Sequence, residues 1–293
     1  MNDDTISITR PSTIVGGPPI AKQPSMSQPV STNTGTSNKL TNNFPTETIE
    51  LPSQGFFYPE GHLLSNGTVE MKMMTAKEED ILTNSNLIKK GIVLDKLLES
   101  LIVTPVKLED ILVGDKNAIF YAARRLAYGD SYGPLKVTCP KCQTENQKTI
   151  DLSHVKSKEF DFSNHQRGQN VFEFVLPYTK KTVTYKLLTH RDEGKIDEEL
   201  KALARINKNI SSEVTVRLRV MIVSVDGNED RNFIKKFVEN DLPSRDSLSL
   251  RKHVKENTPD LDMTFEFICD ECSNEERISV PLTAQFFWPE AGR

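Results

Sequence analysis

The sequence lacks the features that mark several large classes of protein. No apolar run approaches the ~20 residues that a membrane-spanning helix needs. The chain starts MNDDTISITR, which places acids where a secretion signal needs a basic region, and no apolar stretch follows. Four cysteines in 293 residues are too few for a secreted scaffold held by disulfides. We therefore expect neither a membrane span nor a disulfide framework.

Motifs typical of catalysis are also missing. The sequence contains no GxxxxGK[ST], no GxGxxG after a strand, no HExxH and no GxSxG. Acid pairs such as Glu78-Glu79 and Glu198-Glu199 are typical of solvated helix faces or helix caps. Five histidines are scattered, and none lies beside a recognisable nucleophile: His62, His154, His165, His190 and His253. We expect a protein that is not an enzyme.

An excess of basic residues is absent too. The chain has 37 basic and 41 acidic side chains and a net charge of -4. Proteins that coat nucleic acid normally carry a basic excess. The pairs Arg124-Arg125, Lys180-Lys181 and Lys235-Lys236 are isolated, and no aromatic residues alternate with them as a stacking surface requires. We therefore expect no direct binding of nucleic acid.

Apolar residues make up only 37% of the chain, and the deficit is concentrated in residues 1–45. This Pro-, Ser-, Thr- and Asn-rich arm buries too little apolar surface to offset its ordering entropy. It is either a flexible tail or an arm that extends along a neighbouring subunit. In the second case Ile14-Val15 and Pro18–Ile20 would be its anchor points. The rest of the chain has ordinary globular content.

Residues 46–134 read as a helical subdomain that follows an extended segment. Thr75 and Glu78 fit a capping box, which predicts a helix over 76–89. Helical periodicity predicts a second helix that ends before Pro105 and a short element at 108–112. Asp115 is the expected cap of a further helix that stops at Gly129.

From Leu135 the hydrophobic period changes to two, which is typical of strands. Strands are expected at 135–139, 147–151, 171–176, 182–188, 263–268 and 278–281, after a short extended stretch at 69–74. Helices are expected at 191–207, around 233–238 and at 244–256, and 214–225 is a buried helix or a strand. In the helix at 191–207 we expect the apolar side chains to face the core. They are Ile196, Leu200, Leu203, Ala204 and Ile206. Asp226-Gly227 is the expected turn.

The motif with the most chemical content is a pair of CxxC sequences, Cys139-Pro140-Lys141-Cys142 and Cys269-Asp270-Glu271-Cys272. Each can present two thiolates from one tight turn, and two such turns make a tetrahedral site that suits Zn²⁺. Each CxxC also leaves one strand-like run and enters another, as in a zinc ribbon. We therefore predict one structural Zn²⁺ per chain, held by Cys139, Cys142, Cys269 and Cys272. Residues 143–268 would be a 126-residue insertion within the ribbon.

Other uses of these cysteines stay open. A redox CxxC usually stands at a helix N-terminus rather than in a hairpin. Two local disulfides or an iron–sulfur site are further alternatives. A catalytic zinc is disfavoured because four thiolates leave no open coordination position. Lys141, Lys148 and Arg277 are candidates to offset the negative charge of the site, or they are solvated surface.

These patterns predict an α+β fold. It consists of an N-terminal helical unit and a zinc-ribbon-like pair of β knuckles that carries a long mixed α/β insertion, preceded by a disordered or extended N-terminal arm. The expected divisions are 1–45 for the arm, 46–134 for the helical subdomain and 135–293 for the ribbon-like subdomain with its insertion 143–268.

Several segments together resemble a known family. They are ELPSQGFFYPEGHLL, MTAKEEDILTNSNLIKKGIVLDKLLESLI, GDKNAIFYAARRLAYG, VTCPKC, MIVSVDG, LPSRDSLSLRKHV and PLTAQFFWPE. In this order and combination, over roughly residues 50–290, they are similar to the T4-like phage baseplate hub subunit family. The first 45 residues lie outside the resemblance.

The resemblance implies a structural subunit of the hub at the distal end of a contractile phage tail. Such a subunit is assembled in the host cytoplasm and resides in the virion. It acts by binding other tail proteins (hub, tube or wedge subunits) within an oligomeric assembly. Leu51–Tyr58 and Phe286–Trp288 are candidate contact or core-anchoring segments, unless their aromatic residues only cover the chain's own core.

Two alternatives remain. Some related small tail proteins act as assembly factors, so the chain is alternatively an assembly chaperone that is absent from the mature particle. A zinc-ribbon protein that binds nucleic acid is the other alternative.

Overall fold

The computed structural model describes residues 45–206, 212–280, 282 and 284–287. All of them belong to one unit, Asn43–Arg293. The predictions for the arm at 1–45, with its two anchor points, and for Trp288 fall outside the described residues, apart from Pro45.

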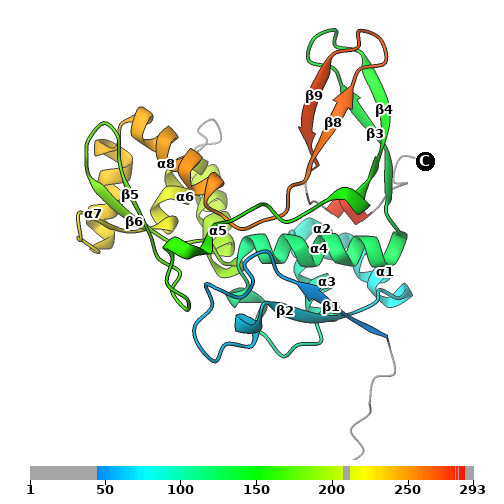
Figure 1. Ribbon diagram of the computed structural model, residues 1–293, viewed down its shortest axis with the longest axis horizontal. Helices are drawn as coiled ribbons and strands as arrows, with labels where there is room; N and C mark the ends of the chain where they lie inside the picture. The colour runs from blue at the N-terminus through cyan, green and yellow to red at the C-terminus, as the bar shows by residue number, and fades with distance from the viewer. Residues whose placement is uncertain (1–44, 207–211, 281, 283, 288–293) are drawn as a thin grey trace, which may run out of the picture. The chain divides into compact units, whose positions relative to one another are not determined.

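The described residues form an α+β fold, as predicted, with eight α-helices and small antiparallel sheets (Figure 1). The helices are α1 (Ala76–Thr83), α2 (Ser85–Lys90), α3 (Val93–Leu101), α4 (Val113–Tyr128), α5 (His190–Ile206), α6 (Glu213–Met221), α7 (Arg231–Lys236) and α8 (Ser244–Glu256). The strands are β1 (Thr46–Glu50), β2 (Thr68–Lys72), β3 (Ser131–Thr138), β4 (Glu145–Asp151), β5 (Phe172–Val175), β6 (Thr182–Tyr185), β7 (Ile222–Val225), β8 (Thr264–Ile268) and β9 (Glu275–Ser279). The sheets are β1-β2, β3-β4, β5-β6-β7 and β8-β9.

The helical region begins with the predicted capping box, but its first helix is shorter than expected. The Glu78 carboxylate accepts a hydrogen bond from the Thr75 amide at 2.9 Å, which fixes the start of α1. The single helix predicted over 76–89 is wrong, because α1 ends at Thr83 and α2 begins at Ser85. The break falls at Asn84, whose side chain accepts from the amides of Asn86 and Leu87 and so starts a new helix.

The prediction that Asp115 caps α4 is also wrong. Helix α4 begins at Val113, and Asp115 lies in its first turn with a fully buried side chain. Its carboxylate accepts from the Ser53 amide (2.9 Å), the Ser53 hydroxyl (2.7 Å) and the Tyr58 hydroxyl (2.7 Å). Burial raises the pKa of Asp115, although the bonds from Ser53 and Tyr58 oppose the rise. Asp115 therefore holds the segment Leu51–Tyr58 against the start of α4 instead of capping the helix.

Both candidate contact segments contribute to the main core. Leu51, Phe57 and Tyr58 are buried, and so are Phe286 and Phe287. The Phe287 ring meets Phe120 of α4, and the Phe286 ring meets Tyr132 of β3. A buried Arg124 donates from Nε to the Phe286 carbonyl, from Nη1 to the Gly129 carbonyl and from Nη2 to the Ser131 carbonyl. The described parts of these segments therefore anchor the core, and the division at 134/135 stays a prediction.

The segment 214–225 contains both elements that its sequence allows. Helix α6 ends at Met221, and the chain continues directly into β7, which pairs with β6. The expected turn follows, with positive φ angles of 50° at Asp226 and 78° at Gly227.

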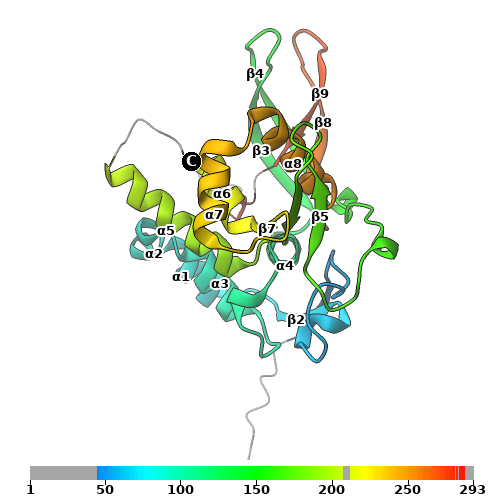
Figure 2. The same ribbon diagram turned by 90° about the vertical axis from the view of Figure 1, so that its left-hand side faces the viewer.

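The apolar face of α5 is less buried than expected. Ile196 is buried, but Ala204 and Ile206 are exposed. Helix α5 has 17 residues and packs on α6, which has nine, so α6 is too short to cover the whole length of α5. Figure 2 shows this end of α5 lying out beyond α6.

Candidate metal centre

Two β-hairpins bring the four cysteines together. The β3-β4 hairpin pairs Thr138 with Glu145 and carries Cys139 and Cys142 in its turn. The β8-β9 hairpin pairs Ile268 with Glu275 and carries Cys269 and Cys272. Both views show the hairpins side by side with their turns at the same end (Figures 1 and 2).

The two turns have the same backbone structure. The amide of the first cysteine donates to the carbonyl five residues later, at 2.9 Å for Cys139 and 3.0 Å for Cys269. The residue after the second cysteine donates back to the first cysteine's carbonyl, and it has a positive φ, 61° at Gln143 and 51° at Ser273. Each CxxC is therefore a knuckle whose two sulfurs point to one side, as predicted from the spacing.

The sulfur positions fit one tetrahedral ion. The four Sγ atoms lie within 4.8 Å of one another. The distance is 3.7 Å between Cys139 and Cys272 and 3.6 Å between Cys142 and Cys269. Ligands at the ~2.3 Å Zn–S distance, on the corners of a tetrahedron, are separated by about 3.8 Å. Disulfide bonding places sulfurs at about 2.05 Å, so these contacts are not disulfides.

Hydrogen bonds favour the thiolate form at two of the four cysteines, Cys269 and Cys142. The amides of Cys272 and Glu271 are the main groups that lower the pKa of Cys269, to about 6. Hydrogen bonds from Thr144 lower the pKa of Cys142. The Asn274 amide also lowers the pKa of Cys272, but desolvation and the neighbouring cysteines outweigh it and raise that pKa to about 12. Four thiolates repel one another at this spacing, and a divalent cation removes the repulsion.

The knuckles have a small apolar core of their own. Cys139, Cys269 and Phe267 are buried together, and Val137 and Ile278 pack against them. This cluster is separate from the main core of the described residues. The stability of the hairpin ends therefore depends mainly on contacts between the two hairpins and on the group that binds the four sulfurs.

One residue of the centre, Asn146 of β4, was not predicted from the sequence. It is buried, and its Oδ1 accepts from the Asp270 amide of the opposite knuckle at 2.8 Å. Its Nδ2 donates to the Thr144 carbonyl at 2.9 Å and lies 3.6 Å from the Cys269 sulfur. Asn146 therefore joins the two knuckles next to a ligand. An asparagine inside a strand-like run is the available sequence clue, because strands are depleted in this residue.

The three basic residues considered for offsetting the thiolate charge pair with carboxylates or are exposed. Lys148 forms an ion pair with Asp270 in the second knuckle. Arg277 contacts Asp262, at 3.3 Å, and Lys141 is exposed. The neutral side chain of Asn146 contacts the Cys269 sulfur directly.

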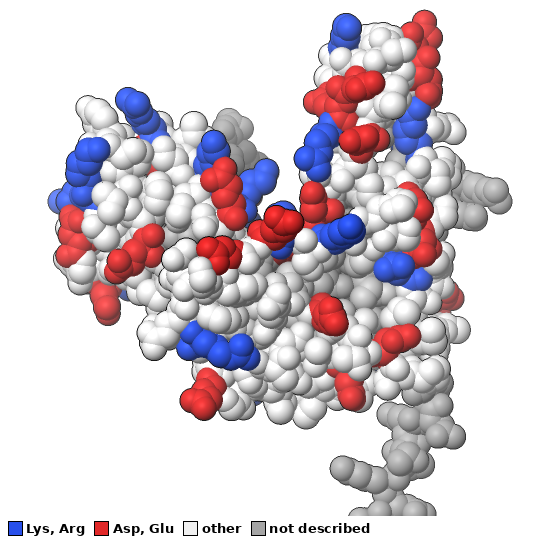
Figure 3. All heavy atoms as spheres, viewed as in Figure 1, with Lys and Arg blue, Asp and Glu red and all other residues white. Residues whose placement is uncertain are grey.

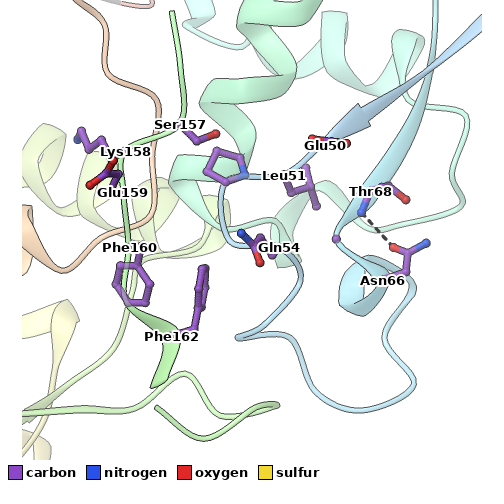
Figure 4. A pocket seen from close by; sticks show the side chains of 12 residues that line it. Glu50, Leu51, Gln54, Asn66, Thr68, Ser157, Lys158, Glu159, Phe160 and Phe162 are labelled. Atoms are coloured by element: carbon purple, nitrogen blue, oxygen red, sulfur yellow. Dashed lines mark hydrogen bonds between the residues drawn. The ribbon is translucent and has the colours of Figure 1, made fainter. Parts of the chain in front are cut away.

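A cavity of 680 Å³ lies apart from the cysteines and carries no comparable chemistry. Figure 4 shows it between the turn that follows β1 and the extended segment 157–162, with Leu51 and Gln54 on one side and Phe160 and Phe162 on the other. Its one cation, Lys158, lies 3.8 Å from the Asp260 carboxylate. Among the described residues, the four cysteines are the only group of three or more candidate metal ligands that come together.

The family described as T4 bacteriophage base plate protein matches residues 50–288, which is most of the chain and includes both knuckles. The chain belongs to this family. The predicted relation to T4-like phage baseplate proteins is thus confirmed. No curated protein and no solved structure matches the chain.

Membership in this family gives the protein a structural role in a phage baseplate, in the tail of the virion. Its partners are accordingly other phage tail proteins. No helix in the described parts of the chain has the length and apolar character needed to span a membrane.

Proposed function

We propose that this protein is a permanent subunit of the baseplate hub, which acts by binding other tail proteins and performs no catalysis. The family match over residues 50–288 is the observation that supports it most, because it covers the helical region, both knuckles and the segments between them. The order of segments that resembles hub subunits supports a location in the hub. The protein is assembled into the tail in the host cytoplasm as part of an oligomeric complex.

We further propose that Cys139, Cys142, Cys269 and Cys272 hold one structural Zn²⁺ per chain, in a zinc-ribbon-like arrangement. The matching knuckles and the sulfur spacings of 3.6 and 3.7 Å support this proposal. Four thiolates close the coordination shell, which suits a structural ion. Each CxxC lies in a hairpin turn and not at a helix N-terminus, which disfavours a redox role.

The surface supports protein partners over nucleic acid. Arg124 of the Arg124-Arg125 pair is buried, so it is not available to a phosphate backbone. On the face seen in Figure 3, acidic and basic side chains are interspersed, and acidic ones gather towards the end of the paired hairpins. Asp270, Glu271, Glu275 and Glu276 are exposed there.

Mass spectrometry of purified tails tests the location. A hub subunit is present in mature particles in a fixed ratio to known baseplate proteins. Presence in assembly intermediates, with absence from mature particles, would establish the assembly chaperone instead. Elemental analysis of the purified chain tests the ion and should give about one zinc per chain. Iron in place of zinc would contradict its identity, and a wild type whose two hairpin ends are fully ordered without any metal would contradict the site itself.

A further inference from the structure

Helices α6 and α8 form a groove with an apolar floor. It has a volume of 390 Å³, within the range of ligand pockets in proteins. Val214, Leu218 and Met221 of α6 and Val254 of α8 line it. Leu218 and Met221 form the buried floor, and Val214 is 43% exposed at the open end.

The groove continues at one end into a smaller apolar cavity of 140 Å³. The two share Arg217, Met221 and Val254, so they are parts of one depression. The smaller cavity is closed by Leu112–Gly114 at the start of α4 and by Pro259. An occupant therefore meets a deep apolar end and a shallow one.

The rim of the groove is positively charged. Arg217, Arg251 and Lys255 line it with a single carboxylate, Glu213, which gives a net charge of +2. Within the described part of the chain, Arg217 lies 4.0 Å from Glu213, and neither Arg251 nor Lys255 has an ion pair. All three cations are exposed.

We propose that this groove docks an acidic amphipathic helix of a partner protein. Apolar side chains on one face of that helix would fill the floor, and carboxylates beside them would meet Arg217, Arg251 and Lys255. The nine residues of α6 span about 14 Å, enough for two or three turns of a helix with apolar residues at i, i+4 and i+7. The proposal rests on the proposed function only for the class of partner, a protein.

Three designed peptides test the proposal on the full-length protein. The first has leucines at i, i+4 and i+7 of a helix and glutamates beside them. The second replaces the glutamates with lysines, and the third replaces the leucines with serines. By fluorescence anisotropy the first should bind at least about tenfold more tightly than either of the others. Its affinity should fall as salt is added, because charges on the rim contribute to the binding.

A charge-reversal variant identifies the surface that binds. Arg251→Glu with Lys255→Glu should weaken binding of the glutamate peptide about tenfold and should favour the lysine peptide instead. The matched control is Lys89→Glu with Lys90→Glu on α2, two exposed lysines outside the groove, and it should leave both affinities within about twofold. Thermal melts check that both variants fold.

Several results would overturn the proposal. One is equal binding of the two charged peptides, and another is no binding of the glutamate peptide at a Kd of about 1 mM or tighter. A third is an equal loss of affinity in the charge-reversal variant and in its control. If the serine peptide binds as tightly as the first, the apolar floor does not contribute to the binding. None of these results bears on whether the protein occurs in mature tails, so failure of the groove and failure of the hub assignment are distinguishable.

Discussion

At the scale of single residues, Asn146 is the side chain that most directly links the cysteine centre to its surroundings. It accepts the Asp270 amide of one knuckle, donates to the Thr144 carbonyl of the other and approaches the Cys269 sulfur. Outer-sphere groups of this kind orient metal ligands and tune their affinity. A neutral donor suits this place because it offsets thiolate charge without needing a counter-ion.

Replacing Asn146 should weaken the binding of the proposed Zn²⁺. We expect Asn146→Ala to release zinc to a competing chelator about ten times faster than wild type. Asn146→Asp should be faster still, because its carboxylate adds negative charge beside four thiolates. The measurement is the rate of zinc transfer to a coloured chelator, with the exposed neighbour Gln147→Ala as the control. Equal release rates in all of these variants would show that Asn146 does not support the ion.

Substituting cobalt for zinc distinguishes an effect of Asn146 on the Cys269 sulfur from an effect on the stability of the hairpins alone. If Asn146 acts on the Cys269 sulfur, the thiolate-to-cobalt absorption bands should shift in Asn146→Ala and stay unchanged in Gln147→Ala. A variant that only lowered the stability of the hairpins would leave those bands in place.

At the scale of elements, Glu78 shows how one buried carboxylate can fix the start of a helix. It accepts from Lys72 of β2 (2.8 Å), from the hydroxyl of Ser100 on α3 (2.6 Å) and from the amide and hydroxyl of Thr75. Burial raises its pKa, but the hydrogen bonds from Lys72, Ser100 and Thr75 outweigh this and lower the pKa from 4.5 to about 2. The carboxylate thereby joins α1, α3 and β2.

The pH dependence of stability should show the contribution of Glu78. Between pH 2 and 4.5 the unfolded chain binds the Glu78 proton more tightly than the folded chain does, so stability rises with pH in that window. The contribution is complete above pH 4.5 and is lost as the pH falls towards 2. Glu78→Gln should reduce this rise, and at neutral pH it should lower the free energy of unfolding by about 2 kcal/mol.

Urea unfolding at about pH 3 and about pH 6 measures the effect. The control is Glu79→Gln, the neighbouring residue on the exposed side of α1. If Glu78→Gln and Glu79→Gln unfold alike at both values, the network around Glu78 does not stabilise the fold.

At the scale of the whole molecule, the cysteine centre joins segments that lie far apart in the sequence but does not hold the main core together. The main core extends from Leu51 to Phe287, whereas the knuckles form their own small cluster around Cys139, Phe267 and Cys269. Removing the proposed Zn²⁺ should therefore release the ends of the two hairpins before it affects the main core.

Hydrogen exchange can test this separation. In chelator-treated protein, and in Cys272→Ser, we expect amides of β8 and β9 near the knuckles to exchange at least about tenfold faster. Amides within α3 and α4 should keep most of their protection. Simultaneous loss of protection throughout the chain would contradict a separate knuckle cluster. Unchanged exchange in β8 and β9 would contradict any role for the metal in stability.

The sequence by itself determined the local features of this protein. It predicted the α+β class, the capping box at Thr75, the turn at Asp226-Gly227 and the two CxxC hairpins, because each depends on neighbouring residues. It did not predict the break at Asn84, because the apolar periodicity continues through that residue while its side chain starts a new helix. The resemblance to a baseplate family was also available from the sequence, because it depends on the order of short segments.

Tertiary structure decided what depends on contacts between distant residues. Asp115 is a plausible helix cap in the sequence, yet its carboxylate binds Ser53 and Tyr58, more than 50 residues away. Ile206 fits an apolar helix face, yet it is 84% exposed. It lies at the end of α5, and the shorter α6 does not cover the whole length of that helix. The meeting of four sulfurs was predicted from spacing, but Asn146 and the groove between α6 and α8 emerge only when separate elements pack together.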